Sequence, residues 1–470
     1  MTASPPPGSF PPNRRGVLLS AAALAFSGLG ARAALAAEGG DILDEVRGYG
    51  ALRPDPAGVL DLPEGFSYQV ISRAGEVMDD GFLTPDHFDG MGCLALPDGR
   101  LALMRNHELD EAEHRLGPAG GRPDLAARLD GLPAFDRSAD GRVLPGGVTA
   151  LVVDPVTGRR ERQHLALAGT VLNCAGGATP WGAWLTCEET LVGAPKTGTR
   201  HGWVFEVPAA ADGPVKPAPL TAMGRFRHEA AAVDPATGTV YLTEDRDDGL
   251  LYRFLPRTPG RLAEGGRLQA LAYADGAGSA DSRNWRRADL AVGETRAVRW
   301  IDLDDVESPQ DDLRKRGHSK GAVLFARGEG VHLSAKLGGG CEVFFTSTSG
   351  GARKLGQIFR LTPGAGPSDD RLELFLESRD TRVLDYGDNL TVAPSGHLVV
   401  CEDRVGISPN HLKVVTPAGQ VCALARLRMR TELAGACFSP DGRFLFVNAY
   451  APGRTFAIEG PWTRFSDRTA

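Results

Sequence analysis

Acidic side chains recur in this chain where short apolar runs end. The runs are "LALMRNHE", "AWLTCEE", "VYLTED" and "LVVCED", and their terminal acids are Glu108, Glu188 with Glu189, Glu244 with Asp245, and Glu402 with Asp403. Carboxylates that lie together repel one another unless some are protonated or a cation lies among them. Hard cations such as calcium prefer oxygen-rich, negatively charged sites of this kind. The alternative is that these acids pair with the many arginines of the chain at an exposed rim.

Two thiols lie close in the sequence to one of these acids, Glu188. Cys187 directly precedes Glu188, and Cys174 lies fourteen residues before Glu188, just ahead of a Gly-Gly turn. The seven cysteines lie at positions 93, 174, 187, 341, 401, 422 and 437. A chain of this length does not need a disulfide framework, so most of them are expected to be buried as small apolar residues, Cys187 included.

Six segments combine a turn, containing Pro-x-Gly or Gly-Gly, with a short apolar strand. They begin at Pro97, Gly176, Pro235, Gly338, Pro394 and Pro440. The tightest interval, from Gly396 to Gly442, is 46 residues, and units of this length with about four strands are typical of β-propellers. The sequence therefore predicts an all-β fold, a six-bladed β-propeller with helical or loop insertions at 110–131 and 256–328. Shorter, more regular spacing would favour the alternative, a pair of β-sandwiches.

Equivalent strand ends of a propeller meet around its central axis. The terminal acids of the apolar runs would then form a ring, which is the arrangement that a cation site requires. The fold prediction and the cation prediction thus depend on the same repeat.

The N-terminal segment is typical of an export signal. Arg14 and Arg15 are adjacent, a short apolar stretch follows, and small residues surround Ala33 to Ala37. The apolar stretch is shorter than the roughly 20 residues that span a bilayer, although an uncleaved anchor remains the alternative. We therefore expect residues 1–37 to be a twin-arginine signal peptide, read by the twin-arginine export machinery, and 38–470 to be one domain, periplasmic or secreted, without stable membrane association.

Charge excludes one class of partner. Removal of residues 1–37 leaves 49 basic residues against 59 acidic ones, a net charge of −10. An acidic chain without a basic cluster is not expected to bind nucleic acid. The phosphate-binding pattern GxxxxGK[ST] is also missing from the sequence.

Several long motifs resemble the PhoX-type alkaline phosphatases. They are "HFDGMGCLALPDGRLALMRNHE", "NCAGGATPWGAWLTCEET", "RFRHEAAAVDPATGTVYLTEDR", "TSTSGGARKLGQIFRL", "GDNLTVAPSGHLVVCEDR" and "ELAGACFSPDGRFLFVNAYAPGRTFAIEGPW". The resemblance runs from about Gly65 to Trp462. It implies a monomeric, exported phosphomonoesterase that acts on small phosphorylated substrates. It also implies a cluster of iron and calcium (Fe³⁺ and Ca²⁺), in which a cysteine thiolate binds iron and carboxylates bind the remaining ions.

The resemblance places the metal ligands residue by residue. They are Glu108, Cys174, Glu188, Glu229, Glu329, Asp388, Asn389 and Glu402. The residues expected to be catalytic are Cys174, Glu188, Glu229 and Arg404. Cys174 is expected to act as an iron ligand and not as a nucleophile, because a thiolate is softer than oxygen and the nearby glycines allow close approach.

Cationic side chains beside the acidic motifs could hold a phosphate in a bidentate manner. The candidates are Arg105, Arg225, Arg246 and Arg404, each of which could equally neutralise an acid. Asn106 and His107 have the same standing, whereas His228 is expected to be structural. Two other functions remain open: a calcium-dependent propeller lactonase or esterase, which has no use for Cys174, and a non-catalytic propeller that binds a partner.

Overall fold

The computed structural model describes residues 46–469, apart from 277–279, 336–339, 365, 367–368 and 405–408. The predicted export signal, residues 1–37, lies outside the described residues. In the part of the chain that the structure describes, no helix has the length and apolar character needed to span a membrane.

Short β-strands separated by tight turns dominate the described residues. The turn "PDGR" illustrates the cause, since Gly99 has a φ of 89°, a left-handed conformation that glycine adopts without strain. Strand β6 (Leu101–His107) follows this turn and is buried throughout. Two helices interrupt the pattern, α2 (Pro123–Asp130) in the first predicted insertion and α3 (Leu313–Ser319) in the second.

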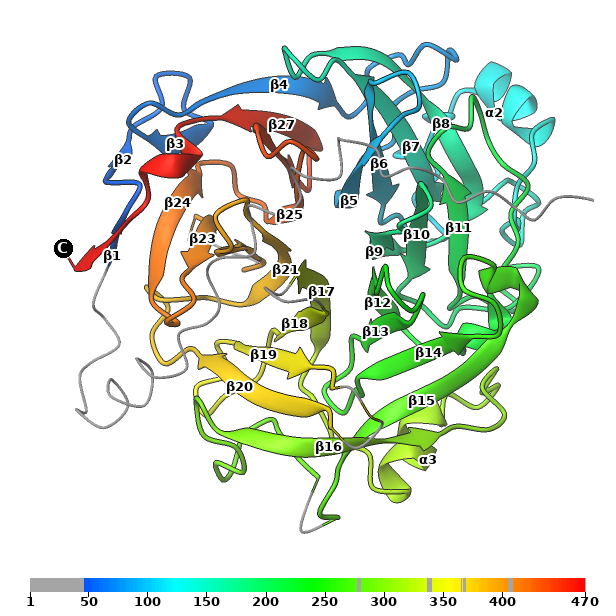
Figure 1. The fold of residues 1–470 in the computed structure, drawn as a ribbon. Helices are drawn as coiled ribbons and strands as arrows, with labels where there is room; N and C mark the ends of the chain where they lie inside the picture. Colours follow the sequence, from blue (N-terminus) through cyan, green and yellow to red (C-terminus); the bar gives the residue numbers. More distant parts are fainter. Residues whose placement is uncertain are drawn as a thin grey trace, which may run out of the picture.

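The strands form sheets that radiate from a common centre (Figure 1). One four-stranded sheet contains β5 (Phe88–Ala95), β6, β7 (Gly146–Val153) and β8 (Arg160–Thr170). A three-stranded sheet contains β9 (Asn173–Ala178), β10 (Ala183–Glu188) and β11 (Val204–Pro208). A second four-stranded sheet contains β25 (Leu433–Phe438), β26 (Phe444–Ala449), β27 (Arg454–Glu459) and β4 (Ser67–Arg73).

Two larger sheets complete the circle. The nine-stranded sheet runs through β12 (His228–Val233), β13 (Val240–Glu244), β14 (Tyr252–Pro256), β15 (Gly266–Tyr273), β16 (Thr295–Asp302), β20 (Arg371–Glu377), β19 (Gln357–Thr362), β18 (Cys341–Ser347) and β17 (Gly328–Ala335). The six-stranded sheet runs through β2 (Leu52–Arg53), β3 (Leu60–Pro63), β24 (Val421–Leu427), β23 (His411–Val415), β22 (Leu398–Glu402) and β21 (Gly387–Val392). Strands β1 (Val46–Gly48) and β28 (Ser466–Thr469) form a separate pair.

Strands β5, β9, β12, β17, β21 and β25, here called the inner strands, surround the centre in this order (Figure 1). Each contacts the next, and β25 contacts β5, so the ring is closed. The N-terminal strand β4 pairs with the C-terminal strand β27, which joins the two ends of the chain. The prediction of an all-β, propeller-like fold is thereby confirmed.

The predicted division into six separate blades does not match the hydrogen-bonded sheets. Strand β16, which lies in the second insertion, pairs with both β15 and β20 and so merges two four-stranded meanders into one sheet. The sheet of β9 has only three strands, and the sheet of β21 is lengthened by β3 and β2. Insertions and the N-terminal strands therefore blur the repeat at the periphery.

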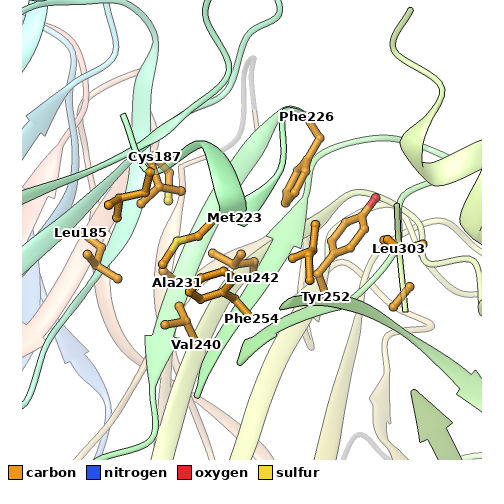
Figure 2. Packing of buried hydrophobic residues seen from close by; sticks show 14 of the residues in the cluster. Leu185, Cys187, Met223, Phe226, Ala231, Val240, Leu242, Tyr252, Phe254 and Leu303 are labelled. Atoms are coloured by element: carbon orange, nitrogen blue, oxygen red, sulfur yellow. The ribbon is translucent and has the colours of Figure 1, made fainter. Parts of the chain in front are cut away.

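Apolar side chains fill the space between neighbouring sheets. Figure 2 shows one such layer, in which Leu185 and Cys187 of β10 lie near Met223, Ala231 and Val240. Cys187 is fully buried in this cluster. It thus packs as the small apolar residue that the sequence predicted.

Candidate metal centre

The inner strands begin in the same register in every sheet. The first residue of each inner strand pairs with the last residue of the strand that follows it. The pairs are Phe88 with His107, Asn173 with Glu188, His228 with Glu244, Gly328 with Ser347, Gly387 with Glu402, and Leu433 with Ala449. A register shift lies close to each of these pairs, as in a β-bulge.

The second residue of each inner strand, here called the axial position, is a potential metal ligand in five of six cases. The axial residues are Asp89, Cys174, Glu229, Glu329, Asp388 and Ala434. The residue after the axial position is glycine or alanine in five of the six inner strands, which allows neighbouring strands to approach: a Cβ on Gly90 would lie 2.4 Å from Cα of Ala175. Close approach of the inner strands thus brings the axial side chains together.

A second ring follows the same register. Its members come directly after the second strand of each sheet and are Glu108, Glu189, Asp245, Thr348, Asp403 and Tyr450. Each donates its backbone N–H to the carbonyl of the residue two positions before the axial residue, over 2.8–3.2 Å. Those acceptors, here called the rim positions, are His87, Leu172, Arg227, Arg327, Tyr386 and Glu432.

Three overlapping groups of side chains could each hold a metal ion. They are Asp89 with Glu108 and Cys174, Cys174 with Glu189 and Glu229, and Glu229 with Glu329 and Asp388. Within each group the ligand atoms all lie within 4.8 Å of one another, a spacing that one ion with ligands at 2.0–2.6 Å can bridge. Cys174 and Glu229 each belong to two groups, so the three form one continuous cluster. Sγ of Cys174 lies 3.3 Å from Asp89 Oδ2 and 3.2 Å from Glu229 Oε1.

Burial makes this cluster unfavourable as a set of bare charges. Burial, and then neighbouring acids, raise the pKa values of Asp89, Glu229 and Asp388 well above the ordinary range. The pKa of the Cys174 thiol is raised by burial and then by Asp89 and Glu229. Asp89 Oδ1 and Glu229 Oε2 are buried without a hydrogen-bond donor. Cations would supply the missing partners and stabilise the ionised forms, so these residues fit a metal cluster.

Two arginines at rim positions contact the cluster. Arg327 donates from Nε to Asp245 Oδ1 at 2.9 Å and from Nη2 to Asp245 Oδ2 at 3.2 Å, and its Nη2 lies 2.9 Å from Glu329 Oε1. Arg227 donates to Glu189 Oε1 at 3.3 Å. Both remain partly exposed, at 32% and 40% of the side chain. They are the cations best placed to meet an anion that approaches the cluster from solvent.

The arginines selected from the sequence have other partners. Arg105 is fully buried, donates to Thr455 and Thr149, and lies 3.5 Å from the ring centre of Phe88. Arg225 donates to the carbonyls of His201 and Leu191. Arg246 pairs with Asp311, and Arg404 pairs with Asp385. Among the described residues, none of the four forms a hydrogen bond or ion pair with the cluster residues.

Glu188 and Glu402 also lie outside the three groups. Glu188 accepts hydrogen bonds from His201 Nδ1 at 2.7 Å and from the backbone N–H groups of Gly202, Val171 and Trp203 at 3.0–3.3 Å. The place expected for Glu188 is taken by the next residue, Glu189.

Glu402 is enclosed in a similar way. It accepts from His411 Nδ1 at 2.9 Å, from the N–H of His411 at 3.0 Å and from the N–H of Asp385 at 3.1 Å. Both glutamates are saturated with donors within their own sheets and need no cation.

Of the remaining candidates, Asn389 bonds a cluster residue, and the two histidines have their partners elsewhere. Asn389 donates to Asp388 Oδ1 at 3.1 Å and accepts from the N–H of Gly435 at 2.7 Å. His228 stacks on Phe226 and bonds the carbonyl of Gly224, the structural role expected for it. His107 bonds Thr149 Oγ1 and the carbonyl of Asp86 inside the first sheet.

The structure thus brings together five of the eight predicted ligands. They are Glu108, Cys174, Glu229, Glu329 and Asp388. It adds Asp89 and Glu189, and it brings Arg227 and Arg327 to the rim. A signal for Asp89 exists in the sequence, since an acid or thiol followed by Gly or Ala recurs in "DG", "CA", "EA" and "EG" at the axial positions.

Comparisons with known proteins identify a matching family and a matching fold. Residues 47–453 match the family model described as alkaline phosphatase PhoX. A comparison with curated protein sequences finds no match.

Among solved structures, PhoX of Pseudomonas fluorescens, in complex with the transition-state analogue vanadate, superimposes with a TM-score of 0.65 at 20% identity, covering 86% of this chain and 96% of that one. A gluconolactonase of Xanthomonas campestris gives a TM-score of 0.41 at 11% identity, covering 88% and 98%, a likeness too loose to bear on function.

Proposed function

The chain belongs to the alkaline phosphatase PhoX family and is a phosphoric monoester hydrolase, and we propose that it works through a metal cluster at the axial and second-ring positions. The observation that carries this proposal is the continuous cluster of buried carboxylates and one thiol, in which Asp89 Oδ1 and Glu229 Oε2 lack a donor. As a set of charges, an arrangement of this kind is stable only with cations inside it.

Oxygen and sulfur ligands divide the cluster between two kinds of ion. The carboxylates suit calcium, and the thiolate of Cys174 suits iron, since soft ligands favour transition metals. Cys174 belongs to two of the three groups, so an iron at this position would adjoin the carboxylate ligands on both sides. When bound, such ions offset the negative charge of a phosphoryl group and lower the pKa of water.

Arg327 is proposed to bind the substrate phosphate. Its guanidinium is a planar fork of N–H donors whose Nε and Nη2 engage Asp245 and Glu329, which leaves Nη1 to donate to a phosphate oxygen. Asp245 and Glu329 orient the fork before any substrate arrives, which lowers the entropy cost of binding. Arg227, on the neighbouring inner strand, presents a second positive charge to the same region. The P. fluorescens relative binds vanadate, and a similar oxyanion would fit between these arginines and the cluster.

The decisive experiment is hydrolysis of an aryl phosphate at alkaline pH, with metal analysis of the same preparation. We expect activity, bound calcium and iron, and a parallel loss of activity and thermal stability after exhaustive chelation. A lactone tested in parallel addresses the lactonase alternative. Full activity in protein stripped of metal would contradict the proposed cluster.

We also infer that the chain is built from six repeated units, exported through the twin-arginine pathway as a monomer. The six equivalent starts of the inner strands support the repeat, although β16 joins two of the sheets. Replacing Arg14 and Arg15 by lysine should leave folded precursor in the cytoplasm, and unchanged secretion would contradict the export pathway. An experimental structure tests the repeat, and the mass in solution tests the monomer.

A further inference from the structure

Four buried polar side chains donate hydrogen bonds to the backbone of the next inner strand around the ring. Each lies one residue before the end of the second strand in its sheet. The bonds run from Asn448 to the carbonyl of Asp89 (2.6 Å), from Asn106 to that of Cys174 (3.1 Å), from Thr243 to that of Glu329 (2.5 Å) and from Thr346 to that of Asp388 (2.7 Å). All four acceptors are axial residues.

The register explains why these carbonyls need a donor. Asp89, Cys174, Glu329 and Asp388 fall in the stretches where the pairing with the second strand shifts. A bulged residue leaves the regular ladder, so its carbonyl needs another donor. A side chain from the strand pair that precedes it around the ring supplies this donor. Asn106 also donates to the carbonyl of Ala175 at 2.7 Å.

The contrast with the last inner strand supports this explanation. Axial Ala434 pairs in register with Asn448, so it remains in the ladder. The equivalent residue of the preceding sheet is Cys401, which offers no hydroxyl or amide donor. Strand β10 carries Cys187 at this position, where the side chain packs in the apolar layer of Figure 2.

We propose that Asn106, Thr243, Thr346 and Asn448 are positioning residues of the metal centre. Each fixes the backbone of an axial ligand on the next inner strand around the ring, and thereby fixes the direction of the ligand side chain. Partners that orient metal ligands typically contribute 10–100-fold to metal affinity or activity. This inference rests on the metal cluster proposed above.

Thr346 allows the sharpest test, because valine has the same shape without the hydroxyl and serine retains the hydroxyl. The probe is the rate at which the purified full chain loses bound calcium and iron to excess chelator, followed by elemental analysis. We expect Thr346→Val to lose metal about tenfold faster than the unmodified protein, and Thr346→Ser to restore slow loss. Thr243→Val and Thr243→Ser repeat the comparison at β13, in the other four-stranded meander of the same sheet.

Thr197→Val is the matched control. Thr197 is buried and donates to the carbonyl of Thr199 at 2.8 Å, in a loop outside the cluster. Thr197→Val should lose stability as Thr346→Val does, while its rate of metal release stays that of the unmodified protein. Equal metal release in Thr346→Val, Thr243→Val and Thr197→Val would overturn the positioning role. Absence of metal from the unmodified protein would instead overturn the cluster itself, and the inference with it.

Discussion

Glu188 and Glu189 are adjacent, buried or nearly so, and close to the same axis, yet their surroundings are opposite. Glu188 receives four hydrogen bonds from His201 and backbone N–H groups. Glu189 faces other acids, and burial followed by Asp245 and Glu108 raises its pKa well above the ordinary range, despite the opposing effect of Arg227. Both side chains are glutamates, so residue type does not distinguish the structural carboxylate from the proposed ligand. The number of hydrogen-bond donors around each carboxylate does.

A side-chain donor to the corresponding glutamate recurs in two other sheets, although Glu244 Oε1 is buried without a hydrogen-bond partner. Glu244 accepts from Tyr252 at 2.7 Å, and Glu402 accepts from His411 at 2.9 Å, while Asp245 and Asp403 follow them in the second ring. In these three sheets an aromatic side chain at the start of the third strand, or just before it, bonds the enclosed glutamate: His201, Tyr252 or His411. Changes to the enclosed glutamates and changes to the second-ring acids should therefore affect different properties of the protein.

The largest effect is expected at an axial position, for Cys174→Ser. A serine hydroxyl stays protonated near neutral pH and cannot supply the soft anionic ligand, so iron and activity should be lost together. We expect activity to fall by more than about 100-fold, beyond the range of residues that only orient ligands. The visible absorption expected from a thiolate bound to ferric iron should also disappear. Cys187→Ser is the control and should keep its iron; equal loss in both variants would indicate unfolding.

Arg327→Met should lower kcat/KM by about 100-fold, the typical cost of removing one well-placed donor to the transition state. Arg327→Lys should fall in between, since it keeps the charge but loses the fork. Arg404→Met, whose arginine pairs with Asp385, should stay within about threefold. Steady-state kinetics with an aryl phosphate decide the matter, and equal losses at both positions would contradict the assignment of Arg327.

Glu188→Gln and Glu189→Gln should have reciprocal effects. The side-chain amide introduced at position 188 would place its NH₂ group against the N–H donors that now bond the carboxylate. This should lower the free energy of unfolding by about 2 kcal/mol. The amide at 189 removes a repelled charge, so the stability of chelated protein should hold or rise while its capacity for metal falls. Urea unfolding after chelation, together with elemental analysis, measures both. The comparison fails if Glu188→Gln loses metal at unchanged stability.

The smallest effect concerns His201. Burial alone would lower its pKa, but Glu188 and Asp136 raise it overall above the ordinary value. A raised pKa in the folded state contributes stability that is complete below the unfolded pKa of about 6.5 and is lost as pH rises through the folded value. Unfolding free energy of the chelated protein should therefore decline above this pH, and the decline should be weaker in His201→Gln. Identical slopes would show that His201 is not charged in its site.

The repeat itself was predictable, because turns and apolar runs are local features. The sequence indicated a propeller, and its strand-end acids lie at equivalent places. It did not indicate that β16 would merge two sheets, since that pairing joins segments such as Thr295 and Glu373, which lie far apart in the chain.

The site was predictable only to the level of the strand end. "CEET" offers two glutamates, and which one turns toward the axis depends on a register shift between Thr186 and Glu188 that composition does not encode. Arg327 was missed for a related reason. It has a φ of 53°, in the left-handed region, and this conformation, not proximity in sequence, directs the chain at the rim.

The bond between Asn448 and Asp89 joins residues 359 positions apart. Strand β4 likewise pairs with β27, near the other end of the chain. During synthesis the N-terminal sheets therefore leave the ribosome with their share of the acids, but without the last sheet that completes the ring. Long-range closure of this kind is slow, because loop entropy opposes it until most contacts exist. Capture of the proposed metal ions would consequently be a late, post-translational event, and the compartment in which the chain finishes folding would decide which ions it acquires.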